Sequence, residues 1–193
     1  MNGLRLALPT PADEQKVWAY REEFLNHVSS MDGTGGLAEA QSFEQWYSRN
    51  LANRCEQTVQ PGFVPATTFL ALDEETDELI GMIDIRHYLN SALLKHGGHI
   101  GYRVRPTCCG RGYATEMLAL ALKQCRTLGL HRVLVTCNRT NLASAKVIVH
   151  NGGVGKRAGK RRHRDPALLD FLIRQIKTKA SPRKRFPRAF LRF

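Results

Sequence analysis

The segment His99–Ala114, with the sequence HIGYRVRPTCCGRGYA, decides the fold that we expect for this chain. Its first half alternates apolar residues with other residues at a period of two, which predicts a short strand that ends at Pro106. Gly110 and Gly112 then lead into a helical pattern over residues 115–128. Glycine lets backbone N–H groups approach a ligand, and a helix N-terminus favours an anion. We therefore interpret the segment as a cradle for the pyrophosphate of a nucleotide-containing cofactor.

The same segment resembles motif A of the GNAT superfamily of acyl-CoA N-acyltransferases. That motif reads Arg/Gln-x-x-Gly-x-Gly/Ala at a strand-to-helix turn, and Gly112 and Ala114 match it. The following YATEMLALAL is similar to the motif A helix. Cys109 stands where Arg or Gln is usual in the family. We expect the cradle to act mainly through backbone N–H groups, so this departure leaves the interpretation in place.

A second resemblance lies in residues 138–153, NRTNLASAKVIVHNGG, which are similar to motif B of the same superfamily. Asn141 and Ser144 fit its Asn-x-x-Ala/Ser start, and Gly152 falls at the expected place. The resemblance covers residues 4–154 and is closest to a bacterial subgroup of predicted acetyltransferases. It implies an α/β (α+β) acyl-CoA N-acyltransferase fold, with a mixed, mostly antiparallel sheet and helices on both faces.

The resemblance also implies a reaction, the transfer of an acetyl group from acetyl-CoA to an amine of a small molecule or peptide. A backbone N–H of the central strand would polarise the thioester oxygen, and the pantetheine arm would pair along that strand. Asn141 would hydrogen-bond the arm, although a plain helix N-cap is the alternative role. The residues expected to contact the cofactor are Tyr102, Val104, Cys109, Gly110, Arg111, Gly112, Tyr113, Ala114, Asn138, Asn141 and Ser144.

The catalytic groups are less clearly marked by the sequence. Asp84 and His87 lie on the strand expected beside the central one, and each is a candidate for the base. Their odd spacing places them on opposite faces of a regular strand, so only one of them can reach the acceptor. The tyrosine that many family members carry on the last helix is replaced by Ile148. The five cysteines lack metal-ligand spacing, so we expect no metal.

The positive charge of the chain is concentrated at its C-terminal end. The formal net charge is +12, and residues 155–193 hold 14 of the 29 basic residues but only 2 of the 17 acidic ones. We therefore divide the chain into an N-acetyltransferase domain, 1–154, whose final strands are not recognisable, and a basic tail, 155–193. In the tail, Asp165 and Pro166 predict the start of a short amphipathic helix. Its apolar stripe would consist of Leu168, Phe171, Leu172 and Ile176.

Three interpretations of the tail remain open. A reading-frame shift near Val154 would explain the abrupt change in charge and the loss of strand alternation. A genuine extension with interleaved phenylalanines would bind nucleic acid or an anionic surface, and the domain would then be a non-catalytic CoA-binding relative. A solvated, disordered tail is the third. Missing final strands would also leave an unpaired sheet edge, which favours a homodimer.

The rest of the composition restricts the class of protein. Residues 4–8 form too short an apolar run for a signal peptide, and Arg5 interrupts it. No apolar run approaches the roughly 18 residues of a transmembrane helix. An odd number of cysteines without a framework is typical of a reduced, cytoplasmic protein.

Overall fold

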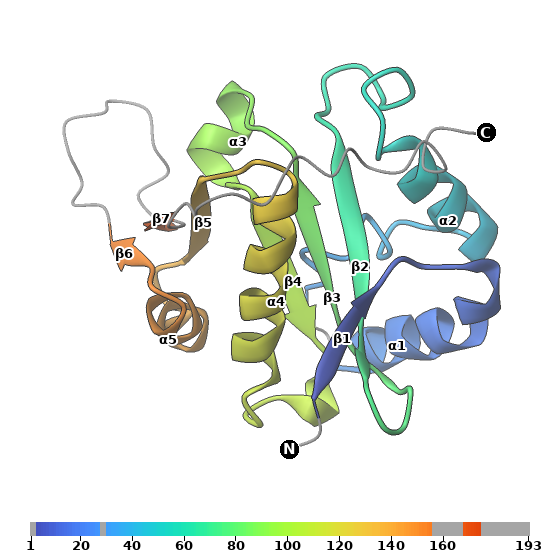
Figure 1. Cartoon of the computed structure of the whole chain (residues 1–193). Coiled ribbons are helices and arrows are strands. Elements are labelled where there is room, and N and C mark those ends of the chain that lie inside the picture. The colour runs from blue at the N-terminus through green and yellow to red at the C-terminus, as the bar shows by residue number, and fades with distance from the viewer. Residues whose placement is uncertain (1–2, 28–29, 156–167, 175–193) are drawn as a thin grey trace.

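The computed structural model describes residues 3–27, 30–155 and 168–174 of the chain, and these form one sheet of seven strands with helices against it (Figure 1). The strand order across the sheet is β1-β2-β3-β4-β5-β7-β6. The strands are β1 (Leu4–Ala7), β2 (Ala66–Asp73), β3 (Leu79–Arg86), β4 (Ile100–Val104), β5 (Arg132–Asn138), β6 (Val154–Gly155) and β7 (Leu168–Arg174). The α-helices are α1 (Glu14–Asn26), α2 (Phe43–Ala52), α3 (Ser91–His96), α4 (Tyr113–Thr127) and α5 (Leu142–His150).

The pairing of the strands confirms the predicted sheet. All neighbouring strands described here pair antiparallel except β4 and β5, which are parallel. A parallel pair needs a crossover connection, and α4 supplies it between these two strands. The expectation of a mixed, mostly antiparallel sheet is therefore correct.

Different helices pack on the two faces of the sheet, because successive side chains of a strand point to opposite faces. On β3, Met82 packs with Val17 and Trp46 of α1 and α2, whereas Ile83 packs with Leu118 of α4. The helix α5 packs on the same face as α4 through Ile148, which is fully buried with Ile83 and Leu118. Helices on both faces are thus confirmed, and α4 lies across the middle of its face (Figure 1).

The predicted amphipathic helix is wrong over Leu168–Arg174, and so is the expectation that the last strands are missing. Asp165, Pro166 and Ile176 lie outside the described residues. Leu168–Arg174 is the strand β7, which pairs with all seven residues of β5. Leu169, Phe171 and Ile173 face the core, while Leu168 and Leu172 are apolar residues on the other face. Because apolar side chains lie on both faces of β7, its sequence shows no alternation between apolar and polar residues. The same residues therefore fit the apolar stripe of a helix equally well. The strand forms because the buried edge of β5 would otherwise leave backbone N–H and C=O groups without hydrogen bonds, and β7 supplies the partners.

Side-chain caps fix the starts of helices. Ser42 caps α2, and its Oγ accepts a hydrogen bond from the Gln45 N–H at 3.2 Å. The connection between β3 and β4 contains the short helix α3. The Asn90 side chain accepts from the Leu93 N–H at 2.9 Å and caps this short helix.

In the part of the chain that the structure describes, no helix is both long enough and apolar enough to cross a membrane.

The strand β7 can be tested against the helix by two substitutions of neighbouring residues. We expect Ile173→Ala to lower the free energy of unfolding by about 2–5 kcal/mol, because Ile173 is 4% exposed and its truncation leaves a cavity. Leu172→Ala should cost clearly less, since Leu172 is only partly buried. Urea unfolding measures both. The opposite order, with Leu172 the more costly, would fit the helical stripe and contradict the strand.

Candidate functional site

The site is organised by the divergence of β4 and β5. Only Ile100 and Val135 pair between these strands, with an isolated bridge from Gly98 to Val135 just before. Here the backbone N–H of His99 donates to the Leu134 carbonyl at 2.7 Å, and the Leu134 N–H donates to the His99 Nδ1 at 3.0 Å. Beyond this point β4 stays with β3 and β5 stays with β7. The two central strands therefore leave an opened edge between them.

The backbone of β4 presents its free groups to this opened edge. The Arg86 N–H donates to the His99 carbonyl at 2.8 Å, and the Arg105 N–H donates to the Ile80 carbonyl at 2.9 Å, so the odd-numbered residues pair with β3. In an antiparallel ladder the alternate residues then point the other way. The N–H and C=O groups of Tyr102 and Val104 accordingly face the side where pairing with β5 has ended.

The glycine-rich turn after β4 has the geometry that a phosphate cradle requires. Gly110 and Gly112 have φ of 79° and 84°, and Gly112 is the N-cap of α4. A residue with a side chain is strained at such angles. Among the described residues, the backbone N–H groups of residues 110–114 have no hydrogen-bond acceptor. Five amides at the positive end of a helix of 15 residues are thus available to an anion.

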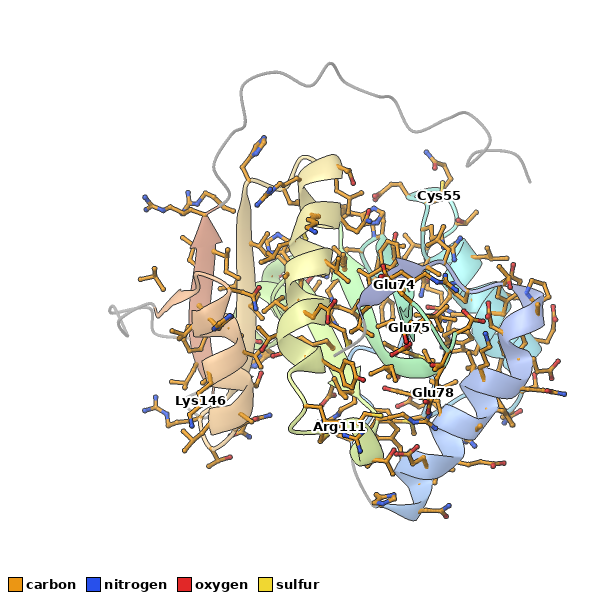
Figure 2. All side chains as sticks on the ribbon, turned by 60° about the horizontal axis from the view of Figure 1, so that its bottom comes forward. Cys55, Glu74, Glu75, Glu78, Arg111 and Lys146 are labelled. Atoms are coloured by element: carbon orange, nitrogen blue, oxygen red, sulfur yellow. The ribbon has the colours of Figure 1, made fainter. Side chains whose placement is uncertain are left out.

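A network of charged groups holds the turn in place. Arg105 forms an ion pair with Glu23 at 2.7 Å and another with Glu78 at 2.5 Å. The Glu23 carboxylate also accepts from the Thr107 N–H and Oγ1 at 2.9 and 2.8 Å. Burial alone would raise the pKa of Glu23, but these hydrogen bonds and Arg105 together hold it below its ordinary value. Arg111 has no ion-pair partner in the described chain and lies exposed beside the turn, as Figure 2 shows.

The residues predicted from motif B lie at the start of α5. Asn141 is its N-cap, and its Oδ1 accepts from the Ser144 N–H at 2.9 Å, which confirms the capping role. The Asn138 Oδ1 accepts from the Thr140 N–H and Oγ1, so this side chain shapes the turn after β5. The Ser144 Oγ and the Tyr102 hydroxyl are 2.8 Å apart, which links α5 directly to β4.

Most of the remaining predicted residues pack in the core behind the cradle, and their side chains are not exposed at its surface. Val104 is 7% exposed in the core, and Tyr113 and Ala114 are the first two residues of α4 and pack against the same core. Cys109 is exposed, and its thiol lies 3.5 Å from the Arg105 carbonyl. Burial raises the pKa of the Cys108 and Cys137 thiols, so neither is a ready nucleophile.

The structure separates the two candidates for the base. The Asp84 Oδ1 accepts from the Thr68 hydroxyl at 3.0 Å, whereas the His87 Nε2 lies 2.9 Å from the Thr67 hydroxyl. Thr67 and Thr68 are consecutive strand residues and point to opposite faces. Asp84 and His87 therefore do not meet, as their spacing predicts. Burial lowers the pKa of His87, which keeps its ring neutral near pH 7.

Three residues near Asp84 were missed in the sequence. The Thr68 hydroxyl also lies 2.7 Å from the Asn50 Oδ1, and the Arg86 Nε lies 3.2 Å from the Asp84 Oδ2. The sequence could have predicted the contact of Arg86 with Asp84, because residues two apart on one strand point to the same face. Thr68 and Asn50 could not be found in this way, since 18 residues separate them in the sequence.

No group of three or more His, Cys, Asp or Glu side chains among residues 3–27, 30–155 and 168–174 could hold a metal ion.

Comparisons with known proteins agree with this geometry. The family model described as the acetyltransferase (GNAT) domain matches residues 4–154. RimJ of Mycobacterium smegmatis, solved with CoA-disulfide, is 22% identical with a TM-score of 0.63, over 89% of this chain and 81% of that one. The ribosomal-protein-S5-alanine acetyltransferase of Vibrio fischeri is 18% identical with a TM-score of 0.62, over 94% and 97%.

A third solved structure is the microcin C7 self-immunity acetyltransferase MccE in complex with acetyl-CoA and AMP. It is 12% identical with a TM-score of 0.61, and the match covers 90% of this chain and 93% of that one. No curated protein sequence matches significantly. At these identities the solved structures establish the fold, which is that of an acyl-CoA N-acyltransferase. The family match covers most of the chain, so this protein belongs to the GNAT acetyltransferase family.

The ring of His99 gives the site a pH dependence. Its Nδ1 accepts a hydrogen bond, and burial lowers its pKa, so the folded protein holds it neutral. The unfolded chain gains a proton below the ordinary pKa of about 6.5. We expect the free energy of unfolding to fall between pH 7 and 5, by at most about 1.4 kcal/mol per pH unit for this group.

The measurement is urea unfolding of the wild type and of His99→Gln across this range, with the exposed His131→Gln as the control. The His99 variant should show the shallower dependence on pH, and the His131 variant should follow the wild type. Equal slopes for all three proteins would contradict the role of His99.

Proposed function

We propose that this protein transfers an acetyl group from acetyl-CoA to an amine of a small molecule or peptide. The observation that carries the proposal is the opened edge of β4, which leads directly into the turn with five available amides. The edge would pair with the amide groups of the pantetheine arm, and the turn would hold the pyrophosphate. The complexes of RimJ and MccE with CoA compounds, in the same fold, support this assignment.

The individual residues fit this cofactor. Gly110 and Gly112 leave the amides uncovered, and a Cβ at Gly110 would meet no atom within 4 Å, so the space in front of the turn is open. Arg111 would add positive charge next to the phosphates. The Asn141 Oδ1 caps α5, while its Nδ2 remains as a donor for the arm.

The reaction needs a neutral amine to attack the thioester carbonyl and a proton for the departing thiolate. The backbone N–H groups of Tyr102 and Val104 would stabilise the carbonyl oxygen as charge develops on it. The Tyr102 hydroxyl, fixed by Ser144, would donate the proton, because burial raises its pKa and keeps the phenol protonated. The proton that the attacking nitrogen loses would then restore the phenol. It would thereby replace the helix tyrosine whose position is taken by the buried Ile148.

Gly112→Val tests the pyrophosphate cradle. We expect it to abolish micromolar binding of acetyl-CoA in calorimetry, because a β-branched residue at a φ of 84° is strained and its side chain would cover the amides. Gly129→Val is the matched control. Gly129 has a φ of 76° at the other end of α4, so this variant carries similar strain far from the cradle. Undiminished binding by Gly112→Val would overturn the cofactor assignment.

Tyr102→Phe tests the proton donor. We expect kcat to fall about 100-fold or more, since general acid catalysis contributes at least that much, with the KM for acetyl-CoA little changed. Tyr47→Phe on α2 is the control. A Tyr102→Phe protein with unchanged kcat would remove this residue from the mechanism.

We also propose that the reaction takes place in the cytoplasm, and the five free cysteines support this location. The second candidate function is binding of nucleic acid or an anionic surface through the basic tail, residues 155–193, most of which lie outside the described part. The charge asymmetry of the sequence favours it. It would appear as retention on nucleic acid that falls steeply with salt and is lost when residues 175–193, which follow β7, are deleted.

A further inference from the structure

We propose that Arg86, held by Asp84, recognises an oxygen atom next to the amine of the acceptor. The acceptor would then be an α-amine with a neighbouring carbonyl or carboxylate, as in a peptide N-terminus or a free amino acid. This inference rests on the proposed acetyl transfer and concerns the acceptor side of the same site. It starts from the ion pair at the end of β3.

The Asp84 carboxylate is buried and engaged on both oxygens. Its side chain is 10% exposed, its Oδ1 accepts from the Thr68 hydroxyl at 3.0 Å, and its Oδ2 lies 3.2 Å from the Arg86 Nε. Arg86 is the more exposed partner at 22%. An approaching acceptor therefore meets the guanidinium first and the carboxylate behind it.

The guanidinium lies against the point where β4 and β5 separate. Gly101 is the first residue of β4 after its last pair with β5, and the Arg86 Nη1 lies 3.4 Å from the position that a Cβ on Gly101 would take. The Gly33 Cα is 3.1 Å from the same position. The absence of a side chain on Gly101 thus lets both the Arg86 guanidinium and the Gly33 backbone pack directly on β4 beside the expected thioester.

This face of the sheet suits the acceptor. The α4 and α5 helices pack on the face to which Tyr102 and Ile83 point. The side chains of Asp84 and Arg86 point to the opposite face of β3, as does that of Met82. A cofactor bound by the N-termini of α4 and α5 would lie on the other side of the sheet, so the second substrate would reach Arg86 from the face on which α1 and α2 pack around Met82.

Most of the N–H donors of the Arg86 guanidinium have no partner in the described chain. Arginine carries five N–H donors, and only the Nε of Arg86 has a partner in the described chain. The two Nη groups match the oxygens of a carboxylate or the lone pairs of a carbonyl. An amine without such an oxygen gains nothing from this contact and meets a positive charge instead. Asp84 then acts as a positioning residue that fixes the direction of Arg86.

Three acceptors separate these possibilities: trialanine, with a carbonyl next to its amine; alanine, with a carboxylate; and putrescine, with neither. Each is measured for turnover with acetyl-CoA and, by calorimetry, for binding to the CoA-saturated protein. The variants are Arg86→Gln, Arg86→Lys and Asp84→Asn. Arg132→Gln, at the exposed start of β5, is the matched control.

The proposal expects the wild type to prefer trialanine or alanine over putrescine. Arg86→Gln should raise the KM for the preferred acceptor by about 10- to 100-fold, the value of a charge-assisted hydrogen bond, and leave putrescine unchanged. Arg86→Lys should fall between the two, and Asp84→Asn should raise KM while kcat is retained. Which of trialanine and alanine is preferred identifies the source of the oxygen.

Other results would overturn the proposal. A preference for putrescine, or an equal loss of activity on all three acceptors in Arg86→Gln, would exclude recognition of an oxygen. A fall in kcat with unchanged KM in Asp84→Asn would make Asp84 the base instead. Failure to bind acetyl-CoA would contradict the proposed function separately. In that case calorimetry of the three acceptors with the CoA-free protein still tests Arg86, because equal binding of all three would remove its role.

Discussion

The whole site depends on one local constraint, the short contact that ties β4 to β5 at a single end. His99 makes this contact twice, once through its backbone and once through its ring, which accepts the N–H of Leu134 as a carbonyl would. The contact fixes the distance between the strands at Ile100 and lets them part afterwards. A continuous ladder would use the backbone groups of Tyr102 and Val104 within the sheet. The divergence keeps them available for a ligand.

The second requirement is that the turn after β4 stays rigid without using its own amides. Glu23 of α1 meets this requirement, because it binds Thr107 and Arg105 from outside the turn. Glu23 therefore links the packing of α1 to the position of the cradle. The charge of Arg105 is paired with two carboxylates, Glu23 and Glu78, so the positive charge offered to phosphates would come from Arg111 and the helix dipole of α4.

The sequence was most informative where function and local structure coincide. The strand, glycine turn and helix of residues 99–114 could be predicted because each has a local cause, namely alternation, positive φ and helical periodicity. The strand β7 could not be predicted, because its seven residues have apolar side chains on both faces and only the edge of β5 distinguishes strand from helix. With β7 in the sheet, the loss of strand alternation no longer supports a frame shift over Leu168–Arg174. The charge asymmetry of the tail is unaffected.

The buried polar group around Asp84 shows why the acceptor side was harder to predict than the cofactor side. The Asn50 Nδ2 donates to the carbonyls of Gly35 and Trp46, which fixes its Oδ1 toward Thr68. A Cβ at Gly35 would lie 2.2 Å from that Oδ1, so the loop before α2 must have glycine there. These residues come from separate elements, and their contacts exist only in the folded chain. Such a network is costly when incomplete, because unpaired buried polar groups lose their hydration. The contacts of Thr68 and Arg86 with the two Asp84 oxygens give the carboxylate a fixed geometry, and with it a fixed direction for Arg86.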